Sequence, residues 1–373
     1  MSASPRPVLL TAGGTGGHVF PAEALAAELA GRGRTLAFVT DRRGQAYGGA
    51  LGRVDIHRIS AGGIAGRGPL ARLASIAALG LGVLQARALI RRLSPAAIVG
   101  FGGYASVPAM AAGAWTGVPT LMHEQNAVLG RANRMLAGRA DLIATSFADV
   151  SHVAPGNRDK IVHVGMPVRP AVAARREGET PLLSADGPIR IVVLGGSQGA
   201  RILSEVIPAA LTALPEALRR RLHLAQQCRP EDLDMVRRAY EGSGIETTLA
   251  SFFDDIPDRL GSAHLVIARS GASTVAELTA LGRPSILVPY AFAVDDHQTA
   301  NARALERVGA AWLIPQPAFD ADTLTRRLLS LFSDPAQLAR AAANARAAGI
   351  PDAARRLADL VDRLTGATSE VVP

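Results

Sequence analysis

The sequence predicts an α/β protein made of two doubly wound, parallel-sheet (Rossmann-like) domains that face each other across a cleft. Three observations support this prediction. The chain has 373 residues, enough for two domains of ordinary size. Short aliphatic runs alternate with longer helical segments, a pattern typical of parallel sheets covered by helices on both faces. The pattern also occurs twice, because "VLLTAGGTGG" from Val8 is echoed by "IVVLGGSQGA" from Ile191.

The composition indicates a folded protein with an anionic partner. Hydrophobic residues make up 48% of the chain, and the formal net charge is +8. This charge favours a phosphorylated ligand, a membrane surface or nucleic acid as the partner, and GC-rich coding bias is the alternative explanation for the many arginines. We expect no nucleic acid, because aromatic residues are only 4% of the chain and are not interleaved with the arginines.

Cysteine and lysine usage excludes several classes of protein. Cys228 is the only cysteine, which rules out an internal disulfide and fits a reducing cytosol. Lys160 is the only lysine, and it lies in neither a phosphate-loop motif nor a Schiff-base context. We expect no signal peptide, and the uncharged apolar stretch at 73–84 is shorter than the ~20 residues that span a bilayer.

The elements follow one another in the same manner in both halves. Two prolines interrupt the periodicity in "VGMPVRPAV" at 164–172, so we expect domains at 1–165 and 166–349. The main expected helices cover 21–31, 70–93 and 204–214. The expected strands are at 7–10, 36–40, 96–101, 119–124 and 141–146 in the first half, and at 189–196, 222–228, 246–253, 264–270 and 284–290 in the second.

The first turn, "TAGGTGGH" at 11–18, predicts a phosphate or sugar site. Its four glycines let backbone N–H groups approach an anion at a helix N-terminus. A tight turn without a ligand needs fewer glycines. The dinucleotide fingerprint of an NAD-dependent oxidoreductase would place its third glycine at Val19, although Asp41 at the end of the next strand keeps this alternative open. His18 closes the turn, where it is either a general base with a pKa near the working pH or a structural hydrogen-bonding residue.

Three turns in the second half predict contacts to a diphosphate and a sugar. "GGSQGA" at 195–200 places Ser197 near a helix start, either as a phosphate ligand or as a simple N-cap. "RSGASTVAE" at 269–277 offers another helix N-terminus, followed by Glu277 as a ribose acceptor or a capping carboxylate. "DDHQTAN" at 295–301 supplies polar groups for sugar hydroxyls. Neither its acids nor "DLD" at 232–234 has good ligand spacing, so we expect no metal.

Two further segments of the first half stand out. "HEQNAVLGRAN" at 123–133 follows a strand and, with the turn at 102–104, is expected to line the same cleft as His18. The apolar segment at 63–92 is bordered by arginines. It is either a core-facing helix with snorkelling arginines or a patch that docks on anionic lipid.

Six motifs in this order and spacing resemble one bacterial family. They are "GGTGGHVFPA", "HEQNAVLGRANR", "GMPVR", "GGSQGA", "RSGASTVAEL" and "DDHQTANA". They are similar to those of the N-acetylglucosamine transferases that use UDP-N-acetylglucosamine and undecaprenyl-pyrophosphoryl-muramoyl-pentapeptide (lipid I) to form lipid II in peptidoglycan synthesis. The resemblance covers residues from about 8 to about 356. It implies an inverting, metal-independent glycosyltransferase of the B-type fold, without a cofactor, on the cytoplasmic face of the inner membrane.

The resemblance also implies a division of labour. The first domain receives the lipid acceptor and associates with the anionic membrane surface through residues 64–84, with Trp115 and Arg139 beside them. The second domain binds UDP-N-acetylglucosamine, and a C-terminal helix at about 350–373 packs back on the first. Two positions depart from the family pattern: Met166 replaces a usual asparagine, and Leu129 replaces a common proline.

Residue roles are carried over motif by motif. His18 is the expected general base for attack by the C4 hydroxyl of the acceptor sugar, and Glu124 is the second candidate. The residues expected at the donor's sugar-diphosphate side are Thr15, Gly16, Gly17 and Asn126. Those expected at the diphosphate or nucleotide are Arg169, Ser197, Ala272, Ser273 and Thr274. Those expected at the uracil, the ribose and the N-acetylglucosamine hydroxyls are Phe253, Glu277 and Gln298, respectively.

Overall fold

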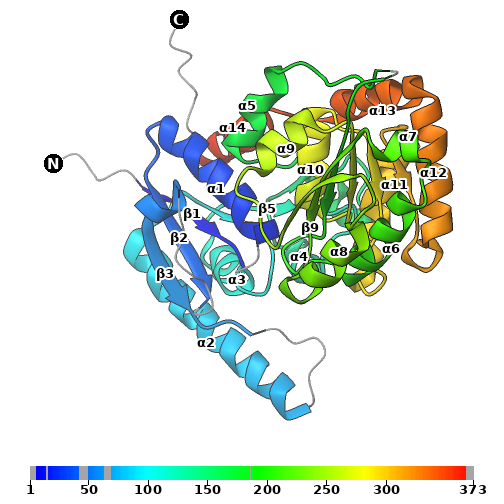
Figure 1. Cartoon of the computed structure of the whole chain (residues 1–373). Helices are drawn as coiled ribbons and strands as arrows, with labels where there is room; N and C mark the ends of the chain where they lie inside the picture. The colour runs from blue at the N-terminus through cyan, green and yellow to red at the C-terminus, as the bar shows by residue number, and fades with distance from the viewer. Residues whose placement is uncertain (1–5, 14–15, 42–48, 63–68, 185, 367–373) are drawn as a thin grey trace, which may run out of the picture. The chain divides into compact units, whose positions relative to one another are not determined.

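The computed structural model describes residues 6–13, 16–41, 49–62, 69–184 and 186–366. It contains two compact units. The N-terminal unit comprises Met1–Arg169 and Asp352–Pro373, and the C-terminal unit comprises Pro170–Pro351. The chain therefore leaves the first unit next to the prolines of "GMPVRP" and returns to it for its last helix (Figure 1).

In the described part of the N-terminal unit, seven parallel strands form one sheet in the order β3-β2-β1-β4-β5-β6-β7. The central strand β1 pairs with β2 and β4, so that Leu9 lies opposite Ala37 on one side and Ile98 on the other. The strands are β1 (Val8–Thr11), β2 (Leu36–Asp41), β3 (Asp55–Ile59), β4 (Ala97–Gly100), β5 (Thr120–Glu124), β6 (Leu142–Thr145) and β7 (Ile161–His163).

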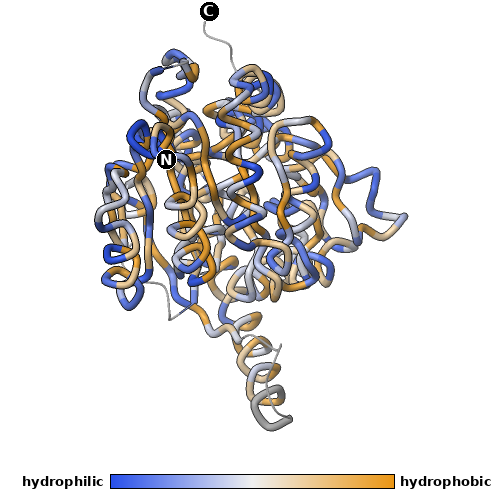
Figure 2. The backbone as a smooth tube through the Cα atoms, turned by 45° about the vertical axis from the view of Figure 1, so that its right-hand side comes forward, coloured by the Kyte–Doolittle hydropathy of each residue, from blue (hydrophilic) through white to orange (hydrophobic). Residues whose placement is uncertain are grey.

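Helices cover both faces of this sheet, and its central strands are buried on both sides. Alternate residues of a strand point to opposite faces. Leu9 and Ile98 belong to the core beneath α2 and α3, whereas Leu10 and Val99 belong to the core beneath α1 and α14. Burial on both faces explains the continuous aliphatic runs of these strands. Figure 2 colours hydrophobic stretches of the backbone orange. The helices are α1 (Gly16–Gly31), α2 (Pro69–Leu93), α3 (Val107–Thr116), α4 (Arg131–Leu136) and α14 (Ala353–Thr365), with short 3-10 turns at Leu51–Arg53 and Pro155–Lys160.

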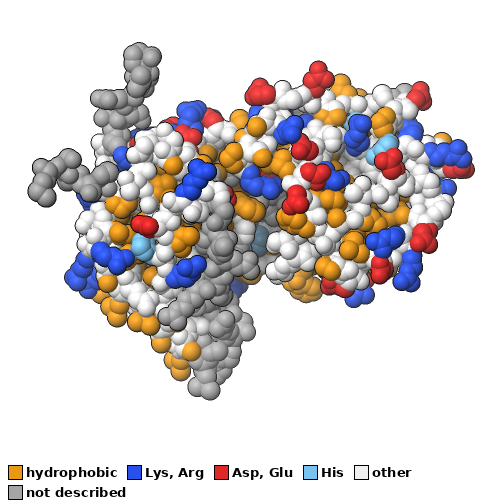
Figure 3. Space-filling view, turned by 60° about the vertical axis from the view of Figure 1, so that its left-hand side comes forward, with side chains coloured by type: hydrophobic (Ala, Val, Ile, Leu, Met, Phe, Trp, Pro, Cys, Tyr) orange, Lys and Arg blue, Asp and Glu red, His pale blue; other side chains and the backbone are white. Residues whose placement is uncertain are grey.

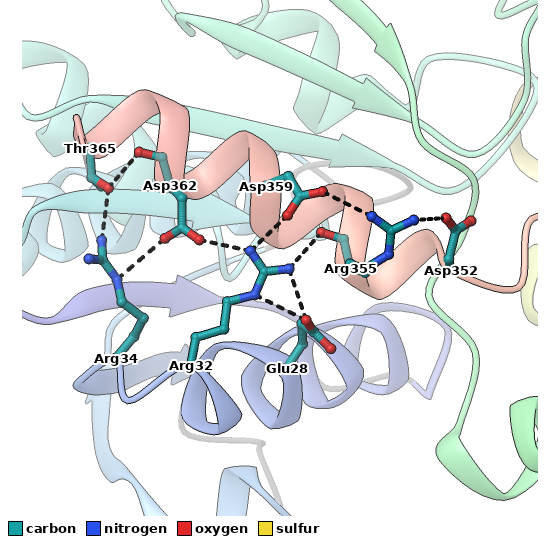
Figure 4. A network of polar contacts seen from close by, with 8 residues as sticks. All are labelled: Glu28, Arg32, Arg34, Asp352, Arg355, Asp359, Asp362 and Thr365. Carbon is teal, nitrogen blue, oxygen red and sulfur yellow. Dashed lines mark hydrogen bonds and ion pairs between the residues drawn. The ribbon is translucent and has the colours of Figure 1, made fainter. Parts of the chain in front are cut away.

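Helix α14 is attached to α1 by an arginine network (Figure 4). Arg32, at the end of α1, donates to Asp359 and Asp362, each at 2.8 Å. Arg34 donates to Thr365 at 2.8 Å. Burial disfavours the charge of Arg32, but the hydrogen bonds that the guanidinium donates to its carboxylate partners outweigh burial and raise the pKa of the guanidinium above its ordinary value. The last helix is therefore part of the N-terminal unit through ion pairs as well as through its apolar face.

In the described part of the C-terminal unit, six parallel strands form a second sheet in the order β10-β9-β8-β11-β12-β13. The strands are β8 (Ile189–Leu194), β9 (Leu222–Gln227), β10 (Glu246–Ala250), β11 (Leu265–Ala268), β12 (Ser285–Leu287) and β13 (Ala311–Leu313). The helices are α5 (Pro170–Ala174), α6 (Arg201–Thr212), α7 (Glu216–Arg219), α8 (Leu233–Tyr240), α9 (Ile256–Ser262), α10 (Ala272–Leu281), α11 (His297–Arg307), α12 (Ala321–Ser333) and α13 (Pro335–Ala348). Short 3-10 turns lie at Arg175–Glu177, Pro230–Asp232, Val294–Asp296 and Gln316–Ala318.

The two sheets share one strand order, which confirms the repeat seen in the sequence. If the strands of each unit are numbered from its own first strand, both sheets read 3-2-1-4-5-6, and the N-terminal sheet adds β7. All ten expected strands are present. The three that the sequence analysis missed, β3, β7 and β13, are edge strands of five or fewer residues. β3 is partly polar, and β7 and β13 have only three residues each, too few to form the longer aliphatic runs that revealed most of the other strands.

Candidate active site

The glycine turn after β1 leads into α1, which begins at Gly16. Thr15 lies outside the described residues. A Cβ on Gly17 would meet open space, whereas one on Gly16 would come within 3.0 Å of the Phe20 ring. The first N–H groups of a helix have no partner within that helix. The start of α1 can therefore present backbone donors to an anion, as the glycine pattern predicted.

His18 is held between two backbone turns. A Cβ on Gly102 would lie 3.3 Å from Cε1 of His18, and a Cβ on Gly103 would lie 3.3 Å from its Cδ2. Both glycines have positive φ angles, of 84° and 72°, a backbone conformation that L side chains rarely adopt. Because β1 and β4 are neighbours, the turns that follow them meet at the carboxyl edge of the sheet. Glycine at 102 and 103 thus makes room for the imidazole.

A chain of hydrogen bonds runs from His18 into the core. Nδ1 of His18 lies 3.1 Å from Oε1 of Gln125. Nε2 of Gln125 lies 3.1 Å from Nδ1 of His123, whose Nε2 lies 3.0 Å from the carbonyl oxygen of Gly165. His123 is fully buried, and burial, assisted by the nearby His18, lowers its pKa to about 4. His123 is therefore neutral at neutral pH.

Glu124 organises the loop after β5. It is buried, with 2% of its surface exposed. Its Oε1 accepts from the backbone N–H of Asn126 at 3.0 Å and from the Asn126 side chain at 3.4 Å. Its Oε2 accepts from the backbone N–H of Gly130 and from the Asn133 side chain, both at 2.8 Å. A carboxylate with both oxygens engaged in this way favours an anchoring role and leaves His18 as the better placed base.

Arg169 also lies near the start of α1. Its guanidinium carbon is 5.5 Å from the centre of the Phe20 ring, two residues beyond His18. Glu23, one turn further along α1, has its pKa raised by burial, and the positive charge of Arg169 partly opposes this shift. Arg169, the last residue of "GMPVR", is therefore close to the start of α1. The sequence analysis assigned Arg169 only to the diphosphate or the nucleotide.

In the C-terminal unit, Ser197 is exposed in the turn between β8 and α6. The N-cap of α6 is Ala200, which makes no side-chain capping bond. The alternative of Ser197 as a simple N-cap is therefore wrong. Gly196 and Gly199, which flank Ser197 and Gln198, have positive φ angles of 81° and 68°.

Helix α10 begins at Ala272 after Gly271, and no side chain caps it. Ala272, Ser273 and Thr274 form its first turn, so their N–H groups have no partner within the helix. Among the described residues no partner is found for the buried hydroxyl of Ser273. Glu277, further along this helix, is 8% exposed. The positive end of the helix dipole at this turn favours a phosphate.

Three residues of the "RSGAST" and "DDHQTAN" motifs connect the turn before α10 to α11 and to the loop after β12. Ser270 donates its hydroxyl to the carbonyl of Gln298 at 2.8 Å, and Asn301 donates to the carbonyl of Ser270 at 3.0 Å. Arg269 donates to the carbonyls of two residues after β12, at 3.0 and 3.1 Å. The amide oxygen of Gln298 accepts from the backbone of Tyr290 at 2.9 Å. The only sequence signal for this network was that its members stand inside the "RSGAST" and "DDHQTAN" motifs.

Phe253 is buried, at 6% exposure, and the guanidinium carbon of Arg259 lies 4.2 Å from its ring centre. Its neighbour Phe252 is 71% exposed. The ring of Phe253 therefore fixes the turn after β10 by packing. Its backbone remains the part of the residue suited to contact a base.

Helix α2 has one buried and one exposed apolar face. Leu79, Ala86, Leu89 and Ile90 are buried against the core. Hydrophobic side chains elsewhere on α2, together with Trp115 of α3, are more than half exposed: Leu73 65%, Ile76 54%, Leu81 51%, Leu84 59% and Trp115 64%. Arg87 lies 4.7 Å from the centre of the Trp115 ring. Figure 3 shows hydrophobic side chains gathered at the lower end of the N-terminal unit, with arginines at their edge.

The same helix meets the length and composition of a membrane span at Leu73–Leu93. The sequence analysis had considered only the shorter uncharged stretch at 73–84. One such helix is weak evidence for a span, and α2 packs on α3 and on the sheet through its buried face. Residues 63–68, including the expected Ile64, lie outside the described chain.

Charged residues singled out in the sequence have structural partners. Lys160 donates to the carbonyls of Gly138 and Ala140, at 3.1 and 3.0 Å, beyond the end of α4. In "DLD", Asp232 pairs with Arg229 at 2.7 Å and Asp234 with Arg237 at 2.5 Å. Among the described residues, no group of three or more His, Cys, Asp or Glu side chains is arranged to hold a metal ion.

Both units match models of one family. The glycosyltransferase family 28 N-terminal domain matches residues 8–145, and the family 28 C-terminal domain matches residues 190–357. Among solved structures, a crystal structure of MurG from Acinetobacter baumannii superposes with a TM-score of 0.78 at 28% identity, covering 96% of this chain and 99% of that chain.

Curated relatives agree over almost the whole length. The chain is 65% identical over 361 residues to the UDP-N-acetylglucosamine--N-acetylmuramyl-(pentapeptide) pyrophosphoryl-undecaprenol N-acetylglucosamine transferase of Paramagnetospirillum magneticum, with 97% of each chain covered. It is 56% identical over 360 residues to the transferase of the same name from Rhodospirillum rubrum, covering 96% of this chain and 92% of the relative.

Proposed function

The chain belongs to glycosyltransferase family 28, and on this premise we propose that it forms lipid II from lipid I. It transfers N-acetylglucosamine from UDP-N-acetylglucosamine to the C4 hydroxyl of undecaprenyl-pyrophosphoryl-N-acetylmuramoyl-pentapeptide, with inversion at the anomeric carbon. The identity to transferases of this name, 65% and 56% over nearly the full length, supports the assignment. The NAD-dependent oxidoreductase that the glycine turn left open is set aside, because both domains match glycosyltransferase models.

The observation that carries the mechanism is the position of His18. Its ring is held by Gly102 and Gly103, and its Nδ1 is bonded to Gln125. As the C4 hydroxyl attacks, the new C–O bond forms on the face of the sugar opposite UDP, and His18 takes the hydroxyl proton. The anomeric bond to the diphosphate breaks, and its electron pair leaves with UDP.

The donor binds to the C-terminal unit in this proposal. The uncapped first turn of α10, with Ala272, Ser273 and Thr274, meets the diphosphate, and Ser197 contributes from the turn after β8. Glu277 accepts from the ribose, Gln298 contacts the sugar hydroxyls, and the backbone of Phe253 contacts the uracil. On the N-terminal unit, Arg169 meets the charge that develops on UDP, and Gly16, Gly17 and Asn126 lie near the sugar-diphosphate side.

A transfer assay tests the function directly. With UDP-N-acetylglucosamine and a lipid I analogue, we expect a β-1,4-linked disaccharide product and UDP. UDP-glucose should be a much poorer donor, and NADH should neither bind nor react. Absence of product with the correct donor would refute the proposal. The same assay in EDTA tests the metal-independent chemistry expected from the family, and a strict Mg²⁺ requirement would contradict it.

The N-terminal unit rests on anionic lipid at the cytoplasmic face of the inner membrane, as a peripheral protein. The support is the exposed apolar face of α2, in which residues 73, 76 and 84 share one side by helical spacing, and the arginines beside it. The double variant Ile76→Glu, Leu84→Glu should lose sedimentation with phosphatidylglycerol vesicles and keep its turnover of a water-soluble acceptor. Leu182→Glu, at another side chain that is 69% exposed, is the matched control and should sediment as the wild type does.

A further inference from the structure

Gln125 joins two histidines, and the direction of each hydrogen bond in this chain can be derived from its buried end. A backbone carbonyl only accepts. The carbonyl of Gly165 therefore requires Nε2 of His123, 3.0 Å away, to donate. Because burial keeps His123 neutral, its one ring proton is on Nε2, and its Nδ1 is an acceptor.

The amide of Gln125 is oriented by this acceptor. The group that faces Nδ1 of His123 must be the N–H2 of Gln125, at 3.1 Å. The same N–H2 donates to the backbone carbonyl of His123 at 2.9 Å, a second bond that requires the same orientation. The amide oxygen of Gln125 therefore faces His18.

The tautomer of His18 follows. An amide oxygen only accepts, so Nδ1 of His18 must donate to Oε1 of Gln125 across the 3.1 Å that separates them. We propose that Gln125 and His123 are positioning residues that hold neutral His18 with its proton on Nδ1 and its lone pair on Nε2, so that Nε2 is the base. This inference rests on the proposed function, in which His18 takes the proton of the attacking hydroxyl.

The arrangement also suits the charge that forms during the reaction. When Nε2 takes a proton, His18 becomes a cation, and its Nδ1–H bond to Gln125 becomes a stronger, charge-assisted bond. His123 does not compete for the proton, because it is buried among apolar groups such as the Phe101 ring, whose centre is 5.7 Å away. A carboxylate at position 125 would place an oxygen acceptor opposite the unprotonated Nδ1 of His123, and neither atom could donate a hydrogen bond to the other. This explains why residue 125 carries an amide.

The tautomer is measured by NMR of protein with ¹⁵N-labelled histidine, from the couplings of each ring nitrogen to the ring protons, without any substrate. A His18→Gln sample assigns the His18 signals. At about pH 8 we expect His18 protonated at Nδ1 and His123 protonated at Nε2. In Gln125→Met, His18 should shift toward the Nε2-protonated tautomer. A wild-type His18 protonated at Nε2, or an unchanged spectrum in Gln125→Met, would overturn the proposal.

Kinetics separate positioning from folding. In Gln125→Met we expect kcat to fall about 100-fold, while KM for the donor changes by no more than about twofold, because the lost interaction acts in the transition state. Gln226→Met is the matched control. Gln226 is a fully buried glutamine that accepts from Tyr240 at 2.8 Å in the other unit, so its variant should leave kcat and the His18 tautomer unchanged.

Gln125→Glu is the conservative variant. Its carboxylate still accepts from Nδ1 of His18, so the tautomer should persist and kcat should exceed that of Gln125→Met. The other oxygen of this carboxylate replaces the N–H2 donor that faces His123, so kcat should stay below that of the wild type. A kcat no better than that of Gln125→Met, or a His18 protonated at Nε2, would contradict the proposal.

The experiments distinguish a failure of the proposed function from a failure of the positioning role. If the wild type makes no disaccharide, the transfer reaction is refuted whatever the spectra show. If the wild type transfers normally and Gln125→Met keeps full kcat although its His18 tautomer has changed, the transfer reaction stands and the positioning role is refuted.

Discussion

Nδ1 of His18 lies 3.1 Å from Oε1 of Gln125, a residue 107 positions further along the chain. The contact joins the first turn of α1, which follows β1, to the turn after β5, and the glycines after β4 pack against the same imidazole. These three strands are consecutive in the sheet. Because parallel strands end at one edge, three turns that are distant in sequence build one environment around the expected base.

Replacement of His18 tests that base. We expect His18→Gln to lower kcat by about 10²- to 10⁴-fold, the range of general-base catalysis, and to remove the acid limb of the pH–rate profile. His163→Gln, an exposed histidine of the same unit, is the control and should act as wild type. Near-normal turnover in His18→Gln would mean that another group takes the proton.

Glu124 should behave as an anchor of the loop. Glu124→Gln is expected to lower the free energy of unfolding by about 2 kcal/mol, because the carboxylate accepts four hydrogen bonds and an amide can accept only some of them. The acid limb in the pH–rate profile of Glu124→Gln should remain, because His18 is intact in this variant. Glu205→Gln, in an exposed pair with Arg201, should cost less than about 1 kcal/mol. A variant with full stability and no acid limb would make Glu124 the base instead.

The lowered pKa of His123 predicts that the stability of the protein depends on pH. The folded-state pKa of about 4 lies below the ordinary histidine value, so the unfolded chain binds more protons between about pH 6.5 and about pH 4. The contribution of His123 to the free energy of unfolding is complete above this pH window and is lost as the pH falls through it. We expect the free energy of unfolding of wild type to drop by about 2 kcal/mol more than that of His123→Gln between about pH 7.5 and about pH 5. Equal drops would show that His123 titrates normally.

We expect the ion pairs between the end of α1 and α14 to contribute measurably to the unfolding free energy of the N-terminal unit. Asp362→Asn should lower its unfolding free energy by about 2 kcal/mol, because the side chain is 8% exposed and pairs with both Arg32 and Arg34. Arg355→Ala, whose partner contacts are more exposed, should cost less than about 1 kcal/mol. Urea unfolding can follow Trp115 alone in a Trp312→Phe background, because each unit contains one of the two tryptophans. Equal losses in the two variants would contradict the buried role of Asp362.

The sequence was most informative where a strand is buried on both faces and ends in glycine. Such strands have continuous aliphatic runs, and their turns need glycine for a positive φ or for a close approach, as at Gly102 and Gly103. It was least informative at three edge strands, because β3 is partly polar and β7 and β13 have only three residues each. The residues of the expected site remain predictions.

The sequence by itself determined the repeated α/β pattern, the glycine turns at the strand ends and the family, because these depend on local periodicity and on ordered motifs. Only the tertiary structure decided which hydrogen-bond partners each residue within one motif has, and therefore which role we propose for it. In "HEQN", Glu124 turns to the loop that it anchors, Gln125 turns to His18, and His123 turns to Gln125 and the carbonyl of Gly165. Neighbours in sequence point in different directions at the end of a strand, and their partners lie 107, 42 and 6 positions away along the chain, at places that only packing decides.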